Sequence, residues 1–108
     1  MKYSIELTEQ AEDDIRNIYE YIAEVLLVPG IAAGQLKRIE DGILNLEELP
    51  ERFRIYEKEP WYSRGIHQMP VNNFIVFYTA EKDKKIVTVI RILYGGMDID
   101  EQLNNTEV

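Results

Sequence analysis

Two apolar runs near the end of the chain constrain its fold more than any other feature. Residues 74–80 and 86–94 consist mainly of Val, Ile, Phe, Tyr and Thr, and the five residues of the interval 81–85 that separates them are all charged. These side chains suit a pleated, largely buried surface, and a short polar interval between two such runs is typical of a hairpin. The sequence therefore predicts an antiparallel strand pair that the rest of the chain must cover.

Arg91 is the one charged residue inside the second run. Because side chains alternate between the two faces of a sheet, we expect Arg91 to share a face with Val89 and Leu93, opposite to Ile90. A buried guanidinium needs a carboxylate, a phosphate or water. Two interpretations stay open, an ion pair with an acid from the helices or the tail, and a functional site.

The length and composition indicate one ordinary globular domain. The chain has 108 residues, of which 45% are hydrophobic and 30% charged, enough for a single core and unlike a disordered protein. We expect one domain over residues 1–108, with a tail from about residue 99. Since cysteine is absent and the chain has a single histidine, we expect neither a metal site nor a bound cofactor.

The first residues include an acid before any apolar segment, so no signal peptide is visible. The longest apolar run is far shorter than the ~20 residues that a membrane helix needs. We therefore expect no membrane association and a cytoplasmic location.

The net charge of −8 is unevenly distributed. Residues 1–50 contain four basic and eleven acidic side chains, residues 51–70 four and three, and residues 71–108 four and six. An acidic chain repels the phosphate backbone at long range. No direct binding of free nucleic acid is expected, although the middle third could hold one short anion-binding patch.

The first half of the chain predicts a strand followed by two helices. Residues 3–7 alternate as in a half-buried strand, and Thr8 is a natural N-cap for a helix of about twenty residues. The segment 28–30, Val-Pro-Gly, is expected to end this helix, and a second helix follows up to Leu49. Two helices joined so closely form an antiparallel hairpin that covers one side of the sheet. Within the first helix, Glu12 and Arg16 are expected to pair, and its buried stripe is predicted to contain Ala11, Ile15, Ile18, Tyr19, Ile22, Val25 and Leu26.

The segment 50–70 allows two interpretations. Its four bases alternate with aromatic residues, which suits an anion-binding or base-stacking surface. Alternatively, Glu51, Glu57 and Glu59 neutralise these bases and the aromatic residues are core. A strand is expected over residues 63–69, and its His67 is more simply a packed or exposed bystander than a catalyst. The bases are Arg52, Arg54, Lys58 and Arg64.

After the hairpin, Gly95 and Gly96 are expected to stop the strand, and residues 97–103 could form a short acidic helix. The fold class predicted from all these elements is α+β: an N-terminal strand and an antiparallel helical hairpin packed on an antiparallel sheet.

This order of elements, over about residues 3–98, resembles the RelE/ParE family of bacterial toxins from type II toxin–antitoxin (plasmid-stabilisation) modules. The residues that carry the resemblance are the helix start at 8–22, the stripe that closes on 46–50, the strand Asn-Phe-Ile-Val-Phe-Tyr at 73–78, and the final strand and turn at 89–98. The resemblance implies a toxin neutralised by a cognate antitoxin, whose flexible arm wraps the toxin surface.

Toxins of this family act in one of two ways. RelE-like members cut mRNA on the ribosome without metal, and by resemblance Arg64, Arg91 and Tyr94 would be the catalytic residues here. However, Leu93 and Ile75 stand where some of these nucleases carry histidine and arginine, so the catalytic set is incomplete and an enzymatic activity stays open.

ParE-like members inhibit DNA gyrase. Their final strand typically reads R-x-L-H-G-x-R-D, and residues 91–98 here follow that pattern with tyrosine in place of the histidine and methionine in place of the second arginine. The resemblance favours this branch, without an enzymatic activity. A third possibility is an inactive toxin fold that only binds an antitoxin. The candidate partner-binding residues are Gly95, Gly96, Met97, Asp98 and Leu103.

Overall fold

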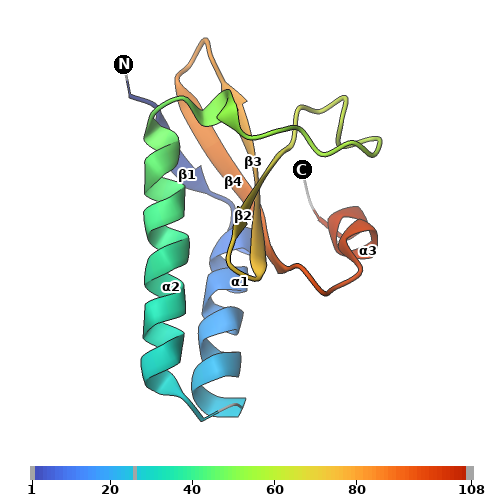
Figure 1. Ribbon diagram of the computed structural model, residues 1–108. Helices are drawn as coiled ribbons and strands as arrows, with labels where there is room; N and C mark the ends of the chain where they lie inside the picture. The colour runs from blue at the N-terminus through green and yellow to red at the C-terminus, as the bar shows by residue number, and fades with distance from the viewer. Residues whose placement is uncertain (1, 26, 107–108) are drawn as a thin grey trace.

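The computed structural model describes residues 2–25 and 27–106 and has the predicted α+β architecture. Two long helices lie antiparallel along one side of a four-stranded sheet, and a short C-terminal helix lies on the other side (Figure 1). Helix–sheet packing of this kind buries the apolar side of each element. The elements are β1 Ser4–Leu7, α1 Glu9–Glu20, a π-helical turn Tyr21–Val25, α2 Pro29–Leu44, the 3₁₀ turns Asn45–Glu47 and Pro50–Arg52, β2 His67–Val71, β3 Phe74–Glu81, β4 Ile86–Tyr94 and α3 Ile99–Asn104.

The strand order in the sheet is β1-β4-β3-β2. The last three strands form the predicted antiparallel meander, while β1 pairs in parallel with β4, with Ser4 opposite Ile86 and Leu7 opposite Val89. The parallel pair is possible because the helical hairpin provides the long crossover connection that two parallel strands need. Strand β4, with a neighbour on each side, is therefore an inner strand.

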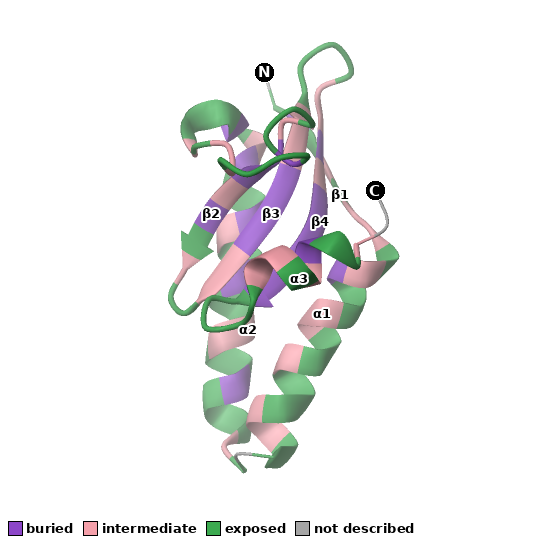
Figure 2. Ribbon diagram, turned by 90° about the vertical axis from the view of Figure 1, so that its right-hand side faces the viewer, coloured by how far each residue is buried: buried purple, intermediate pink, exposed green. Residues whose placement is uncertain are grey.

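The sheet separates two cores (Figure 2). The larger core lies between the helical hairpin and the sheet and contains Ile39, Leu46 and Tyr78. The smaller one, on the opposite face, contains Trp61, Phe77 and Leu103 of α3. Both faces of the inner strands are covered.

The first helix differs from the prediction in its length. The α-helix ends at Glu20, and the chain continues as a π-helical turn to Val25. Leu27 then reverses the chain with a left-handed φ of 58°, and Pro29 begins α2 instead of ending the first helix. Proline fits this position because the first turn of a helix leaves N–H groups without acceptors.

The end of the hairpin projects beyond the sheet (Figure 1), which corrects part of the predicted buried stripe. Tyr19 and Val25 are 39% and 64% exposed, while Leu26 lies outside the described residues. Apolar periodicity identifies the inward face of a helix but not how far the covering layer extends. Arg16 pairs with Asp13 and not with Glu12.

A β-bulge in β4 changes the predicted orientation of Arg91. Phe77 lies opposite Arg91 and Tyr78 opposite Val89, so Ile90 is an extra residue. A bulge of this kind places two successive side chains on one face. The prediction that Arg91 lies with Val89 is wrong, since Val89 belongs to the hairpin-side core whereas Ile90, Arg91 and Leu93 face the side of α3.

Strand β2 begins later than predicted, at His67, and residues 59–65 form turns. His67 is a packed residue, as expected. Its Nδ1 lies 2.6 Å from the carbonyl oxygen of Phe53, to which it donates, and its ring stacks on Tyr78 with 5.1 Å between centroids. Tyr78 in turn donates its hydroxyl to the carbonyl of Pro50. These contacts fasten the segment before β2 to the sheet.

Candidate functional site

Arg91 is held by Asp14, one turn into α1. The Asp14 carboxylate accepts hydrogen bonds from Nε of Arg91 at 2.7 Å and from Nη2 at 2.9 Å, and each side chain is only 11% exposed. A bidentate pair of this geometry is among the stronger charge-assisted interactions in proteins. The ion-pair interpretation of Arg91 is therefore confirmed.

Helix α1 also completes the hydrogen bonding of β4 where β1 ends. Strand β1 stops at Leu7, after which the hydroxyl of Thr8 donates to the carbonyl of Ile90 and Asp14 accepts from the N–H of Ile92, both at 2.9 Å. Thr8 is at the same time the predicted N-cap, since its side chain accepts from the N–H of Ala11. Buried backbone groups must be paired, so these two side chains supply the hydrogen bonds to β4 that β1 would make if it were longer.

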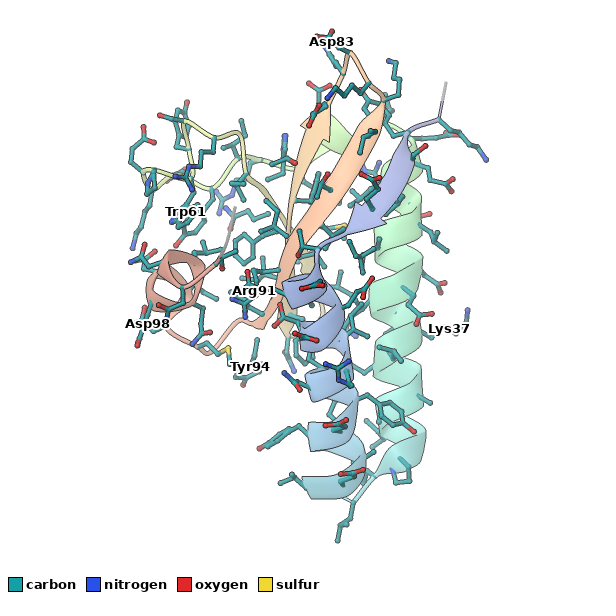
Figure 3. All side chains as sticks on the ribbon, turned by 180° about the vertical axis from the view of Figure 1, so that it is seen from behind. Lys37, Trp61, Asp83, Arg91, Tyr94 and Asp98 are labelled. Atoms are coloured by element: carbon teal, nitrogen blue, oxygen red, sulfur yellow. The ribbon has the colours of Figure 1, made fainter. Side chains whose placement is uncertain are left out.

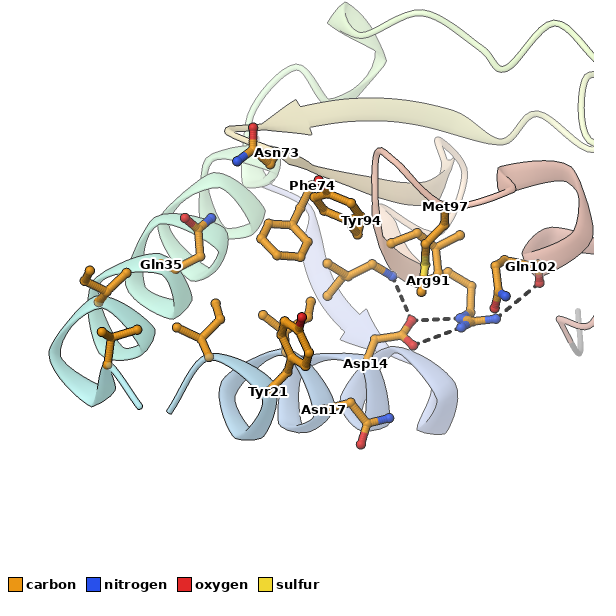
Figure 4. A pocket seen from close by; sticks show the side chains of 16 residues that line it. Asp14, Asn17, Tyr21, Gln35, Asn73, Phe74, Arg91, Tyr94, Met97 and Gln102 are labelled. Atoms are coloured by element: carbon orange, nitrogen blue, oxygen red, sulfur yellow. Dashed lines mark hydrogen bonds and ion pairs between the residues drawn. The ribbon is translucent and has the colours of Figure 1, made fainter. Parts of the chain in front are cut away.

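The remaining nitrogen of Arg91 holds the C-terminal segment. Its Nη1 donates to the carbonyl oxygen of Gln102 at 3.3 Å and to the hydroxyl of Thr106 at 3.1 Å. One guanidinium therefore connects β4, α1 and the end of α3, as Figure 4 shows for Asp14 and Gln102. All three of its nitrogens are engaged inside the protein.

A groove of about 910 Å³ opens beside this network. One wall is formed by α1 and the π-helical turn, another by α2, and the floor by the ends of β3 and β4, with the segment around Met97 at one end (Figure 4). Its lining is mostly apolar, and pockets that bind peptides or ligands typically combine such a surface with a few polar groups. The apolar lining includes Ile18, Tyr21, Ile22, Val28, Ile31, Phe74, Ile92, Leu93, Tyr94 and Met97.

The apolar surface extends from the groove over the end of the hairpin. Tyr21 and Ile31 line the groove and are 55% and 62% exposed, and Leu27, which precedes the lining residue Val28 in the chain, is 76% exposed. A contiguous patch of large exposed apolar side chains is unusual in a protein without a partner. This groove and the hairpin end together form the main candidate interaction surface.

Two glycines set the position of Tyr94 at the rim of the groove. A Cβ atom on Gly96 would lie 2.5 Å from the ring of Tyr94, and one on Gly95 would lie 3.2 Å from the carbonyl oxygen of Asn73. The Tyr94 ring also meets Phe74 edge-on, with 5.9 Å between centroids. The Gly-Gly turn thus allows the half-exposed Tyr94 to lie flat against the backbone.

Asp100 fastens α3 to the segment before β2. Its two oxygens accept from the hydroxyl of Tyr56 and from Nζ of Lys58, each at 2.5 Å. The hydrogen bonds from Lys58 and Tyr56 hold the pKa of Asp100 below its usual value. Burial, followed by the bond to Asp100, raises the pKa of Tyr56 to about 12.

Three of the four bases of the segment 50–70 are engaged in separate contacts. Arg64 lies over the ring of Trp61 at 5.2 Å, Arg52 donates to backbone carbonyls that include that of Glu48, and Lys58 pairs with Asp100. Two of the three acids proposed to neutralise them have other partners, since Glu51 pairs with Lys82 and Glu59 accepts from Ser63.

The structure brings together only two of the three residues that the resemblance made catalytic candidates. Arg91 and Tyr94 line the groove, whereas Arg64 does not; Figure 3 shows Trp61, on which Arg64 lies, above α3 and away from Tyr94. Among the partner-binding candidates, residues 95–98 are exposed, but Leu103 is 1% exposed in the smaller core.

Neither the role of Asp14 nor the groove walls were predicted from the sequence. A signal for Asp14 was present, because it lies three residues after Ala11 and four before Ile18 and so interrupts an apolar stripe. A carboxylate at such a position needs a buried partner.

Among the described residues, no group of three or more His, Asp or Glu side chains could hold a metal ion. No helix in the described part of the chain has the length and apolar character to cross a membrane.

Comparison with known proteins places the chain in a family. The sequence profile of the ParE toxin of the type II toxin–antitoxin system parDE matches residues 5–99. No curated protein matches the chain significantly. The chain belongs to the family of ParE toxins of type II toxin–antitoxin systems, within the RelE/ParE fold.

Solved structures share this fold at low sequence identity. The chromosomal ParDE system from P. aeruginosa matches with a TM-score of 0.69 at 20% identity over 86% of this chain and 96% of that one. The toxin–antitoxin complex RelBE2 from Mycobacterium tuberculosis matches with 0.63 at 16%, over 87% and 99%. The archaeal RelE–RelB complex from Pyrococcus horikoshii OT3 matches with 0.61 at 14%, over 89% and 98%.

Proposed function

We propose that this protein is a ParE-like toxin that inhibits DNA gyrase by binding to it and is neutralised by a cognate antitoxin. The observation that carries the choice of mechanism is the engagement of Arg91. Four of its five N–H donors bind Asp14, Gln102 and Thr106, and the Asp14 carboxylate neutralises its charge, so a phosphate would have to compete with Asp14 for this cation.

Metal-free RNA cleavage needs a base, cations that stabilise the pentacoordinate phosphate, and an acid for the leaving oxygen. Of the candidates for these roles, Arg91 is paired, Arg64 is outside the groove and Tyr94 has no basic neighbour among the groove-lining residues other than Arg91. The net charge of −8 also opposes approach to ribosomal RNA. These features favour a protein-binding inhibitor over a nuclease.

The groove and the hairpin end are the proposed binding site for the antitoxin. The similar solved structures include toxin–antitoxin complexes, and the groove offers an apolar surface of the kind that accepts an amphipathic segment. The exposed turn at residues 95–98 is proposed to contact gyrase.

A supercoiling assay with purified toxin and gyrase tests the mechanism. Loss of supercoiling at micromolar toxin, restored by the protein encoded beside the toxin gene, is the expected result. Full supercoiling together with codon-phased mRNA 5′ ends after induction would establish the nuclease alternative. Absence of growth arrest on expression without the antitoxin would favour the inactive toxin fold.

A further inference from the structure

The segments that form the groove are rich in unneutralised acids. Residues 14–35, 73–74 and 91–102 contain six acidic and two basic side chains. Both bases are paired, Arg91 with Asp14 and Arg16 with Asp13. The remaining acids are Glu20, Glu24, Asp98, Asp100 and Glu101, and of these only Asp100 has an ion pair among the described residues.

Four of these acids have no ion pair among the described residues, and each is a neighbour in the chain of a residue on the apolar surface or close to one. Glu20 and Glu24 are exposed on α1 and the π-helical turn, next to Tyr21. Asp98 and Glu101 are exposed across the groove, beside the lining residues Met97 and Gln102. An apolar floor between two negatively charged rims selects against partners that present acids at the same positions.

We propose, building on the proposed function, that the antitoxin segment in this groove is amphipathic, with lysine and arginine flanking its apolar face. A second copy of this chain fits poorly, because it would bring another −8 against the same rims. Charge complementarity of this kind mainly raises the association rate and excludes like-charged competitors. The toxin therefore recognises a basic neutralising segment.

The test compares two toxin variants with equal changes in charge. The rim variant combines Glu20→Lys with Glu24→Lys. The control variant combines Glu40→Lys with Asp83→Lys, changes at exposed acids elsewhere. Figure 3 shows Asp83 at the end of the sheet opposite to Tyr94. Association with the protein encoded beside the toxin gene is measured at ionic strengths from low to physiological. We expect the rim variant to associate about tenfold more slowly at low salt and the control to change by less than about twofold, because charges beyond a Debye length are screened.

Two synthetic helical peptides separate failure of this inference from failure of the proposed function. They share one Leu/Ile face, which Lys flanks in the first and Glu in the second. We expect only the Lys peptide to bind wild-type toxin, and the Ile22→Ser variant to lose that binding. Equal binding of both peptides, or equal association rates for both toxin variants, overturns the proposal that the groove prefers a basic segment. If the protein encoded beside the toxin gene does not bind while the Lys peptide does, that protein is not the antitoxin, and the proposed preference for a basic segment still holds.

Discussion

Asp14 and Arg91, 77 residues apart in the sequence, form a bidentate ion pair in which both side chains are 11% exposed. The β-bulge at Ile90 turns Arg91 toward α3, and Asp14 reaches it from one turn into α1, which follows β1 in the chain. The pair therefore fixes the junction of strand, helix and C-terminal segment beside the groove.

Removing either partner of this pair is expected to lower the free energy of unfolding by about 3–5 kcal/mol, because the other charge stays buried without compensation. Asp14→Asn combined with Arg91→Met should recover part of that loss, because the asparagine oxygen can still accept from the N–H of Ile92. The exposed pair Asp13–Arg16 is the control, since its side chains are 54% and 61% exposed and its removal should cost less than about 1 kcal/mol. Urea unfolding of all single and double variants provides the measurement, and equal costs for the two pairs would contradict the buried role.

Features that depend on neighbouring residues could be predicted from the sequence, whereas features that depend on tertiary packing could not. Local signals were sufficient for the Thr8 cap, the strand pair and the two helices, because capping and periodicity depend on neighbouring residues. The bulge at Ile90 was missed because an extra residue in a β-branched run leaves no local signature. The groove was missed because it depends on where the sheet ends relative to the helices, which is a tertiary relationship between Tyr21 and Phe74.

The contact between Tyr56 and Asp100 predicts the pH range over which α3 stays docked. Since the pKa of Tyr56 rises from 10.0 to about 12 on folding, its contribution to stability is present below pH 10 and is lost as the pH rises toward 12. The pKa of Asp100 is lowered, so its contribution is present above the usual aspartate range and is lost as the pH falls through the lowered value.

Tyr56→Phe is therefore expected to remove the part of the alkaline destabilisation that Tyr56 causes, while the neutral-pH stability falls slightly. Tyr62→Phe, at a tyrosine that is 54% exposed, is the matched control. Unfolding free energies between pH 7 and pH 11 measure both effects. Identical profiles for Tyr56→Phe and wild type would show that the hydroxyl does not titrate with folding.

Gly96→Ala tests whether the flat position of Tyr94 matters for toxicity. The new methyl group would overlap the Tyr94 ring, at 2.5 Å, and we expect the ring to swing away from the backbone. Gly34→Ala in α2 is the control, since a Cβ there has no atom within 4 Å, and alanine should stabilise the helix by about 0.5–1 kcal/mol. The expected outcome is weaker growth arrest for Gly96→Ala at unchanged melting temperature, and unaltered growth arrest for Gly34→Ala. A fully toxic Gly96→Ala protein would show that the gyrase contact proposed for residues 95–98 requires neither a glycine at position 96 nor the flat position of the Tyr94 ring.

Leu27, at the hairpin end, and Leu49, which follows α2, allow effects on stability to be separated from effects on binding. Both have left-handed φ angles, 58° and 48°, and are 76% and 77% exposed. This conformation is unfavourable for leucine, whereas asparagine adopts it readily. Each leucine-to-asparagine change should therefore stabilise the free toxin by roughly 0.5–1 kcal/mol, because little packing is lost.

Only Leu27 belongs to the apolar surface next to the groove, so Leu27→Asn should weaken antitoxin binding while Leu49→Asn leaves it unchanged. Thermal unfolding and calorimetric titration measure the two effects, and weaker binding of both variants would mean that the antitoxin covers more than the groove and the hairpin end.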